Sequence, residues 1–169
     1  MRVLLLADTH GALDPRIVEL AQDCALAVHA GDVGASAVLD ALAAAAGRVL
    51  AVRGNNDVPD KWRGSPADLA ALPLTLQVPL PGGLLAVEHG DRHPAGQRER
   101  RLRAAHANAR AVLYGHSHRL LRDCALTPWL LNPGAAGRSR TGDGPSCLLL
   151  QARADGWQVD AWRFAKTTR

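Results

Sequence analysis

The residues with the clearest chemical potential are carboxylate, imidazole and amide side chains in five short segments between residues 8 and 118. Each segment directly follows a short apolar run. In order, the segments are Asp8-Thr9-His10, Gly31-Asp32, Gly54-Asn55-Asn56-Asp57, His89-Gly90 and Gly115-His116-Ser117-His118. Carboxylate, imidazole and amide groups without thiolate suit Mn, Fe, Co, Ni or Zn, and disfavour Cu(I) and Ca. The segments therefore predict a site for divalent transition metals.

Spacing within two of the segments supports this interpretation. In Asp8-x-His10 and in His116-x-His118, the two outer residues point to the same side of an extended chain, so each pair can place two ligands in one site. Glycines beside four of the five segments let the backbone turn sharply near a crowded centre. Both features fit a shared metal centre.

Each segment also has a structural explanation when it is taken alone. Asp-x-His and Gly-Asp are common in turns, Asn55 and Asn56 suit left-handed turn positions, and His89 could be a buried core histidine. The Gly-His-Ser-His run is harder to explain, because two histidines that flank one residue after a strand have little structural use. All five segments occur in order and at strand ends, and this combination favours one shared site.

The apolar runs before these segments are short and lack a helical period, so we expect them to be buried strands. They are Met1–Ala7, Cys24–Ala30, Arg48–Val52, Leu84–Glu88 and Ala111–Tyr114. Helices are expected between the first three strands, at Pro15–Gln22 and Ser36–Ala46. Strand–helix alternation gives parallel pairing, and sites in open α/β sheets form beyond the carboxyl ends of strands. The five segments are therefore expected to converge.

The later part of the chain has a more antiparallel character. Leu74–Leu80 and Leu84–His89, joined by Pro81-Gly82-Gly83, predict a hairpin, and Ala95–Ala109 predicts a helix. Ser146–Arg153 and Trp157–Phe164 predict a final hairpin. We expect an α/β protein that forms a single domain over residues 1–169.

Composition sets further bounds on the class of protein. Of the 169 residues, 47% are hydrophobic and only 4% aromatic, which predicts a globular protein with an aliphatic core. None of the apolar runs approaches the roughly 18 to 20 residues that a membrane helix needs, and Met1–Ala7 has no signal-peptide cleavage site. We therefore expect a cytoplasmic protein with no membrane association. Cys24, Cys124 and Cys147 form no CxxC pair and are expected to be reduced, buried thiols.

The net charge of +4 is mild, and its densest patch consists of Arg98, Arg100, Arg101, Arg103 and Arg110. Alanines lie between and around these arginines, which favours the solvated face of a helix over a nucleic-acid groove. No aromatic residues interleave to stack bases. A nucleic-acid substrate therefore has little support from the sequence but stays open.

The order D-x-H, G-D, G-N-x-D, H-G, G-H-x-H resembles the calcineurin-like metallophosphoesterase superfamily. The short length and Asn132-Pro133-Gly134 make the chain similar to the small YfcE-type phosphodiesterases of bacteria and archaea. The resemblance runs from Asp8 to about Arg140. It implies a four-layer α/β/β/α sandwich of two mixed sheets flanked by helices, with the metals at one rim.

Position by position, the resemblance implies two divalent transition metal ions, with Mn as the first choice and Ni, Fe, Co or Zn as alternatives. Asp8, His10 and His118 would hold one ion. Asn55, His89 and His116 would hold the other, and Asp32 would bridge both. The implied activity is hydrolysis of small phosphodiesters by a hydroxide between the metals, without a protein nucleophile.

One position departs from the pattern of the family. Many members carry His after the Gly-Asn, where it is thought to protonate the leaving group, and YfcE-type members often carry Cys; here the residue is Asn56. An amide cannot act as a general acid, a role that is typically worth about 10² to 10⁴ in rate. We therefore expect a preference for good leaving groups such as aryl esters, or protonation through water or another histidine. His93 is one candidate, although a surface loop position fits it as well.

Several residues have supporting roles in this interpretation. Asp57 is the candidate for orienting the metal-binding imidazoles. Asn55 and Arg138 are candidates for substrate contact, since Arg138 follows the Asn132-Pro133-Gly134 loop that lies near the site in the family. His29 is expected in the core or behind the ligands, and His106 on a helix surface.

Other functional classes stay open at this stage. The fold could serve as a non-catalytic protein-interaction module, as in a retromer subunit that resembles this family, although the complete ligand set favours catalysis. Among enzymes, a nuclease, a cyclic-nucleotide phosphodiesterase and a phosphomonoesterase are alternatives. The resemblance also implies a homo-oligomer, a dimer or tetramer.

Overall fold

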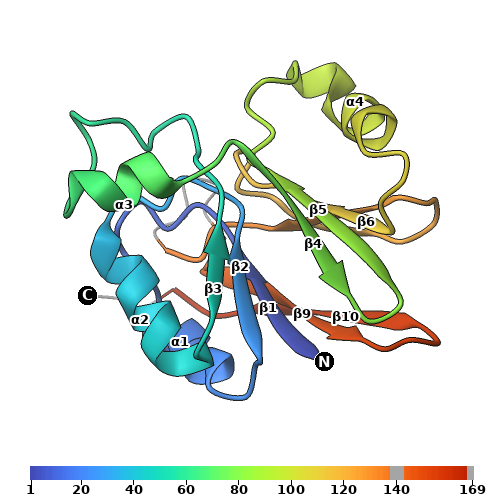
Figure 1. Ribbon diagram of the computed structural model, residues 1–169, viewed down its shortest axis with the longest axis horizontal. Helices are drawn as coiled ribbons and strands as arrows, with labels where there is room; N and C mark the ends of the chain where they lie inside the picture. The colour runs from blue at the N-terminus through green and yellow to red at the C-terminus, as the bar shows by residue number, and fades with distance from the viewer. Residues whose placement is uncertain (138–142, 167–169) are drawn as a thin grey trace.

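Two five-stranded sheets pack face to face in the computed structural model, which describes residues 1–137 and 143–166 (Figure 1). The first sheet has the order β10-β9-β1-β2-β3, with β1 (Arg2–Leu6), β2 (Leu26–His29), β3 (Val49–Ala51), β9 (Ser146–Ala152) and β10 (Trp157–Arg163). The second has the order β4-β5-β6-β8-β7, with β4 (Thr75–Leu80), β5 (Gly83–Glu88), β6 (Ala111–Leu113), β7 (Leu120–Asp123) and β8 (Trp129–Pro133).

Both sheets are mixed. In the first, β1, β2 and β3 pair in parallel, while β9 and β10 join them antiparallel. In the second, β5, β6 and β8 pair in parallel, and β4 and β7 lie antiparallel at the two edges. Parallel neighbours end at the same edge of a sheet, so the segments that follow β1, β2 and β3, and those that follow β5 and β6, leave each sheet together.

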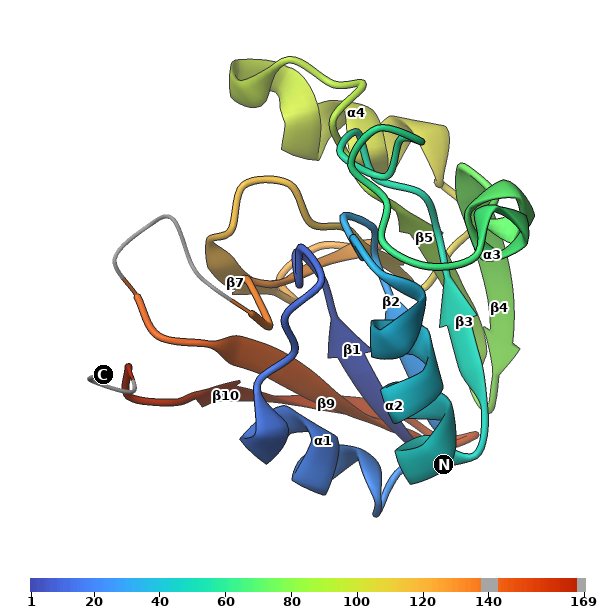
Figure 2. The same ribbon diagram turned by 90° about the vertical axis from the view of Figure 1, so that its left-hand side faces the viewer.

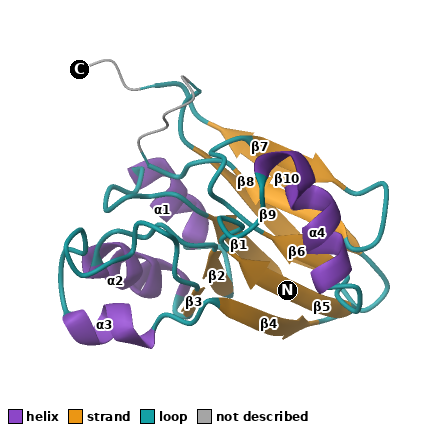
Figure 3. Ribbon diagram, turned by 90° about the horizontal axis from the view of Figure 1, so that it is seen from above, coloured by secondary structure: helices purple, strands orange, loops and turns teal. Residues whose placement is uncertain are grey.

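Helices cover the outer faces of both sheets. They are α1 (Pro15–Ala21), α2 (Ser36–Ala46), α3 (Pro66–Ala71) and α4 (Arg98–Ala105), the last preceded by a 3₁₀ turn at Ala95–Gln97. Figures 2 and 3 show α1 and α2 on the side of the first sheet and α4 on the side of the second. The layers are therefore α/β/β/α, and the predicted four-layer sandwich is confirmed.

The alternation of side chains along β1 explains how this strand serves two layers. Val3 and Leu5 belong to the core between the sheets, whereas Leu4 and Leu6 pack under α1 and α2. Successive residues of a strand point to opposite faces, so a strand that is buried on both faces must be apolar throughout. On the outer face of the second sheet, Leu102 of α4 packs in a smaller apolar cluster.

One predicted helix is shorter in the structure, and one observed helix was not predicted. The helix expected over Ala95–Ala109 ends at Ala105, and His106 caps it with a non-helical φ of −122°. The short helix α3 was not predicted, because six residues give no periodic signal. Its start is nevertheless encoded locally, since Ser65 accepts a hydrogen bond from the Ala67 N–H and Pro66 occupies the first turn.

The expectation for the cysteines was wrong at one position. Cys24 and Cys147 are buried, but Cys124 is exposed. It follows β7 in a connection whose residues 124–127 all face solvent, so no packing partner covers the thiol. Both buried thiols belong to the apolar cluster under α1 and α2.

The arginine patch is only partly a solvated helix face. Arg100 and Arg101 are exposed on α4, as expected. Arg103, however, donates to the carboxylate of Asp123, and Arg110 lies beyond the helix with its guanidinium over the Trp129 and Trp157 rings. These two arginines therefore join α4 and the segment after it to the sheets.

Among the described residues, no helix has the length and apolar character needed to span a membrane.

Candidate metal centre

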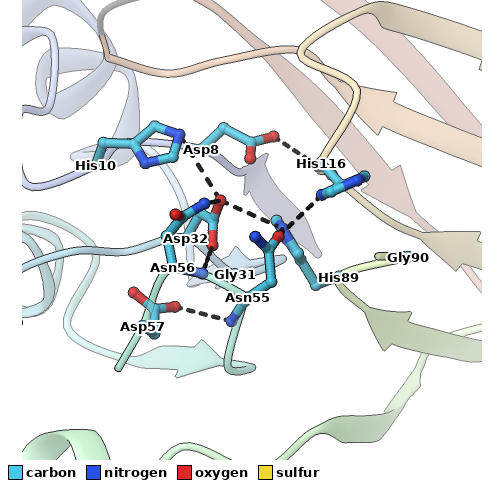
Figure 4. Close-up of polar contacts among 12 residues, drawn as sticks. Asp8, His10, Gly31, Asp32, Asn55, Asn56, Asp57, His89, Gly90 and His116 are labelled. Atoms are coloured by element: carbon cyan, nitrogen blue, oxygen red, sulfur yellow. Dashed lines mark hydrogen bonds and ion pairs between the residues drawn. The ribbon is translucent and has the colours of Figure 1, made fainter. Parts of the chain in front are cut away.

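All five predicted segments meet at the rim where the parallel strands of both sheets end (Figure 4). Those of the first sheet supply Asp8 and His10 after β1, Asp32 after β2 and Asn55 after β3. The second sheet supplies three histidines, His89 after β5 and His116 and His118 after β6. The candidate ligands therefore come from both layers of the sandwich.

The first group of donors consists of Asp8, His10 and His118. Nε2 of His10 lies 3.2 Å from Nε2 of His118, which in turn lies 3.5 Å from Oδ1 of Asp8. One ligand atom from each residue lies within 4.8 Å of the others. This is the group that the resemblance assigned to one cation.

The second group consists of Asn55, His89 and His116. Oδ1 of Asn55 lies 3.2 Å from Nε2 of His89 and 3.0 Å from Nδ1 of His116 (Figure 4). The two imidazoles meet edge to face, with ring centroids 5.2 Å apart. An amide oxygen and two imidazole nitrogens are thus gathered around one point.

Asp32 lies between the two groups. Its Oδ2 atom is 3.8 Å from Nε2 of His10 and 3.4 Å from Nε2 of His89. Asp8, Asp32 and His89 also form a compact set, with one ligand atom from each within 4.8 Å of the others. A single carboxylate that reaches both groups is what a bridging ligand requires.

These separations fit donors that share a cation. Ligand atoms about 2.0 to 2.2 Å from a metal lie roughly 3 to 3.5 Å from one another in octahedral or tetrahedral arrangements. The closest donor pairs of the two groups are 3.0 to 3.5 Å apart. Carboxylate, imidazole and amide donors, with no thiolate among them, suit first-row divalent metals.

The hydrogen bonds of His89 define which of its nitrogens can bind a metal. Nδ1 lies 2.8 Å from the Ala30 carbonyl oxygen, which can only accept, so Nδ1 carries a proton and Nε2 faces Asp32 and Asn55. Burial lowers the pKa of His89, but the Asp32 hydrogen bond and the charges of Asp8 and Asp32 outweigh it and raise that pKa to about 9. Without a bound metal, His89 therefore carries a proton on both ring nitrogens near neutral pH.

The other charged groups respond to the same surroundings. Burial raises the pKa of Asp32, but the hydrogen bond and charge of His89 and the two hydrogen bonds from Asn56 outweigh it, so the pKa lies below its ordinary value. Burial lowers the pKa of His116, and the positive charges of His89 and Arg98 lower it further. Asp32 is therefore ionised, and His116 is biased toward the neutral form that binds metals.

Backbone strain is concentrated on the candidate ligands. Within the described residues, the non-glycine residues with positive φ are Asp8, His10, Asp32, His116 and His118, with values from 48° to 67°. Left-handed backbone costs an L-residue roughly 1 to 3 kcal/mol and tends to cluster at functional sites. Each of these five residues was predicted as a ligand from its side chain alone, and the backbone gives an independent signal at the same positions.

Two glycines allow the segments to approach one another. A Cβ atom on Gly54 would lie 2.2 Å from both N and Oδ1 of Asp32, and one on Gly115 would lie 2.9 Å from Oδ2 of Asp8. Neither position has room for a larger residue without moving a candidate ligand. The glycines therefore bring the loops from β3 and β6 close to the two carboxylates.

Asp57 supports the loops of the site through the backbone. Its carboxylate accepts hydrogen bonds from the amides of Val33, Gly34 and Gly54, at 2.8 to 3.1 Å. It was expected to orient imidazoles, but the hydrogen bonds that it accepts within the described residues come from these amides. Asp57 therefore connects the loop that carries Asp32 to the loop that carries Asn55.

His29 lies behind the site, as expected. Nδ1 accepts a hydrogen bond from the Gly31 amide, so Nε2 carries the proton and donates to Oγ1 of Thr9. The Thr9 hydroxyl in turn donates to the Val33 carbonyl oxygen. Complete burial, reinforced by the charge of His89, lowers the pKa of His29 to about 3 and keeps it neutral. Thr9, which the sequence interpretation left without a role, connects the first two loops.

Asn132 supports the loop of His116 and His118. Its Nδ2 donates to the Gly115 carbonyl (2.9 Å) and to Oγ of Ser117 (3.1 Å), while Oδ1 accepts from the Gly134 amide. The Asn-Pro-Gly motif was recognised in the sequence, but its partner loop was not. Arg138, the predicted substrate contact, lies outside the described residues, as does Arg140.

Two of the remaining histidines share a carboxylate outside the ligand groups. Nε2 of His93 lies 2.8 Å from Oε1 of Glu88, and Nε2 of His106 lies 2.8 Å from Oε2. The expectation that His106 lies on the helix surface was wrong, since only 12% of its side chain is exposed. Its pairing with Glu88, which faces α4 from the end of β5, accounts for the burial. The pairing with Glu88 likewise gives His93 a structural role.

Asn56, the position that departs from the family pattern, contacts Asp32 twice. Its backbone amide donates to Oδ1 (2.8 Å) and its side-chain Nδ2 donates to Oδ2 (2.7 Å). Lys61 donates from Nζ to the other end of the same amide, Oδ1, across 2.7 Å. The two partners fix the orientation of the side chain, with its nitrogen toward Asp32.

The fold and the site define a class, the α/β sandwich proteins with a candidate metal centre at the rim of two sheets. The family follows from comparison with known proteins. Residues 1–155 match the calcineurin-like phosphoesterase superfamily domain, and the chain belongs to this superfamily. Its members are usually hydrolytic phosphoesterases. No curated protein sequence matches significantly.

Solved structures share the fold at low sequence identity. Vps29 of Chaetomium thermophilum superposes with a TM-score of 0.79 at 17% identity, covering 99% of this chain and 93% of its own. Vps29 of Entamoeba histolytica complexed with Zn²⁺ gives 0.74 at 18%, with 97% and 98% covered. A structure described as a novel archaeal phosphodiesterase gives 0.70 at 20%, with 96% and 100% covered. At these identities the likeness establishes the fold, and a structure described as a phosphodiesterase is among those that share it.

Proposed function

We propose that the protein is a metal-dependent phosphodiesterase that binds two divalent cations and hydrolyses small phosphodiesters. The observation that carries this proposal is the coincidence of donor chemistry and backbone strain at Asp8, His10, Asp32, His116 and His118. A scaffold that did not use these side chains would have no reason to keep five strained residues at one rim. Membership of the phosphoesterase superfamily agrees with this function.

We assign the ligands by the two donor groups. Asp8, His10 and His118 would hold one cation, Asn55, His89 and His116 the other, and Asp32 would contact both. Mn²⁺ is the metal that we propose first, since the carboxylate and amide oxygens of Asp8, Asp32 and Asn55 suit it, and the four imidazoles keep Ni, Fe, Co and Zn as alternatives. Bound cations would supply Lewis acidity and lower the pKa of a coordinated water.

The protein residues contribute positioning. The Ala30 carbonyl fixes the tautomer of His89 by holding a proton on Nδ1, and Asp57 and Asn132 hold the loops that present the ligands. Asn55 is also proposed as a contact for substrate phosphate, because its amide lies exposed at the mouth of the site. Asn56 supplies no acidic proton, so esters with good leaving groups are the proposed substrates.

The decisive experiment combines metal analysis with turnover of bis(4-nitrophenyl) phosphate in added Mn²⁺. We expect the wild-type protein to retain transition metal and to hydrolyse the diester. We expect Asp32→Asn to lower kcat/KM at least about 100-fold, since it removes the charge that both cations share. Asp40→Asn is the matched control, because Asp40 is an exposed residue of α2.

A non-catalytic interaction module predicts the opposite result. In that case the purified protein would contain no transition metal, and Asp32→Asn would match the wild type in every assay. Either finding would remove the enzymatic proposal.

A further inference from the structure

A cleft of about 570 Å³ opens beside the candidate metal centre on the side of His116. It lies between α4 with its preceding turn and the connection from β6 to β7. The residues that define its chemistry are Arg98, Glu99, Tyr114, His116, Arg119 and Leu120. Its volume is in the range of pockets that hold small organic ligands. Because His116 is both a wall of the cleft and a candidate ligand, a molecule bound at the metals can extend into it.

Two guanidinium groups give the cleft its charge. Arg98 is half-buried and anchored by one nitrogen, Nε, which donates to the Gly90 carbonyl oxygen across 2.8 Å. Within the described residues no hydrogen bond or ion pair occupies its other two nitrogens. Arg119 is exposed. Within the described residues, its backbone amide donates a hydrogen bond to Oγ of Ser117, and its guanidinium makes no hydrogen bond. Both arginines therefore keep donors available.

Glu99 also lines the cleft, and it is the one carboxylate among the lining residues. Arg98, Arg119 and Glu99 together therefore give the lining a net charge of +1. Tyr114, which directly follows β6, and Leu120 of β7 add apolar surface. A cleft with an apolar wall and paired guanidinium groups matches a ligand that carries both an organic body and a phosphate, since the planar fork of arginine complements phosphate oxygens.

We propose that this cleft is a substrate subsite for a second phosphate group, so that the preferred substrates are phosphodiesters in which one ester arm carries a further phosphate. This inference rests on the proposed phosphodiesterase function and specifies its substrate class. Arg98 reaches the phosphate from the helix side and Arg119 from the loop side. The scissile phosphate lies at the metal centre, and the second phosphate lies beyond His116.

The test compares two chromogenic diesters that differ by one phosphate. They are thymidine 5′-(4-nitrophenyl phosphate) and the same compound with a 3′-phosphate. We expect the wild-type protein to prefer the 3′-phosphorylated compound at least about 10-fold in kcat/KM, the usual effect of a charge-assisted hydrogen bond. In Arg119→Gln this preference should fall at least about 10-fold, and in the control Arg100→Gln it should persist, because Arg100 is exposed on α4 and does not line the cleft.

A binding measurement separates this inference from the proposed function. Thymidine 3′,5′-bisphosphate should bind the metal-free wild-type protein and Arg100→Gln equally, and Arg119→Gln about 10-fold more weakly. If no diester is hydrolysed but the bisphosphate binds in this pattern, the phosphodiesterase proposal fails and the subsite stands. Equal binding to all three proteins, or an equal loss of activity on both diesters in Arg119→Gln, would overturn the subsite.

Discussion

The side-chain amide of Asn56 donates from Nδ2 to Oδ2 of Asp32 across 2.7 Å, and Oδ2 is the atom that faces both donor groups. The amide thus lies next to the carboxylate that we propose as the shared metal ligand. It stabilises the ionised carboxylate but has no acidic proton to give. The lack of an acidic proton at this position is the reason why we expect the proposed reaction to depend on the leaving group.

Asn56→His is expected to relieve that dependence. An imidazole can donate to Asp32 and can also protonate a leaving alkoxide, so turnover of thymidylyl-(3′,5′)-thymidine should rise at least about 10-fold relative to bis(4-nitrophenyl) phosphate. Steady-state kinetics on both diesters gives this ratio. Asn56→Gln, which keeps an amide, should leave the ratio as it is in the wild type. A ratio that does not change in Asn56→His would mean that protonation depends on another group.

Replacing His10 tests the strain at the ligand positions. His10 has a φ of 48°, which glycine adopts freely and alanine does not. In EDTA we expect His10→Gly to be more stable than His10→Ala by about 1 kcal/mol, the reverse of the usual order of these residues. Urea denaturation measures the difference. Both variants should lose most of the increase in Tm that Mn²⁺ gives the wild type. An alanine variant as stable as the glycine variant would show that the position is not strained.

The stability of the metal-free protein should have a maximum near pH 6.5. The pKa of His89 is raised to about 9, so its contribution is complete below about 6.5 and is lost as the pH rises through 9. The pKa of His29 is lowered to about 3, so the folded state loses stability as the pH falls from about 6.5 toward 3. Urea unfolding in EDTA across this range gives the profile.

His89→Gln separates the two limbs of that profile. Glutamine does not titrate, so the decline between pH 6.5 and about 8 should disappear, while the acid limb due to His29 remains. If the variant kept the decline of the wild type between pH 6.5 and about 8, the charge of His89 in the metal-free site would be refuted.

Asn132→Ala should weaken the site without touching a ligand. Asn132 is fully buried and donates to Gly115 and Ser117, so its loss leaves backbone groups unsatisfied and should cost about 1 to 3 kcal/mol of unfolding free energy. The loop that carries His116 and His118 also loses its support, so Mn²⁺ affinity should fall. Calorimetric titration measures the affinity. The exposed Asn108→Ala serves as the control, and equal affinity in both variants would limit Asn132 to a role in stability.

The sequence predicted the strand ends of the site well, because each carries a local signal. An apolar run that stops at Asp8 or at Asp32 can be recognised from a few residues of sequence. Parallel pairing of the strands then brings such strand ends together. Even α2 was predicted at its observed bounds, since Gly47 ends it with a left-handed φ of 72°.

Contacts between distant segments were not predictable in the same way. Asn132 and Gly115 are 17 positions apart, and nothing in either local sequence specifies the other. Glu88 at the end of β5 pairs with His93 in the loop that follows and with His106, 18 positions away at the end of α4. Asp57 was expected among imidazoles, yet the loop geometry turns it to backbone amides. Such roles depend on the packing of the whole sandwich.

The division of the ligands between the two sheets has a mechanical consequence. One sheet supplies Asp8, His10, Asp32 and Asn55 from the segments that follow its strands, and the other sheet supplies His89, His116 and His118. His10 and His118 lie 108 positions apart in the chain, so a cation held by both would close a very long loop. Occupied metal sites would therefore act as cross-links between the layers, and the sheets would separate only when the metals leave.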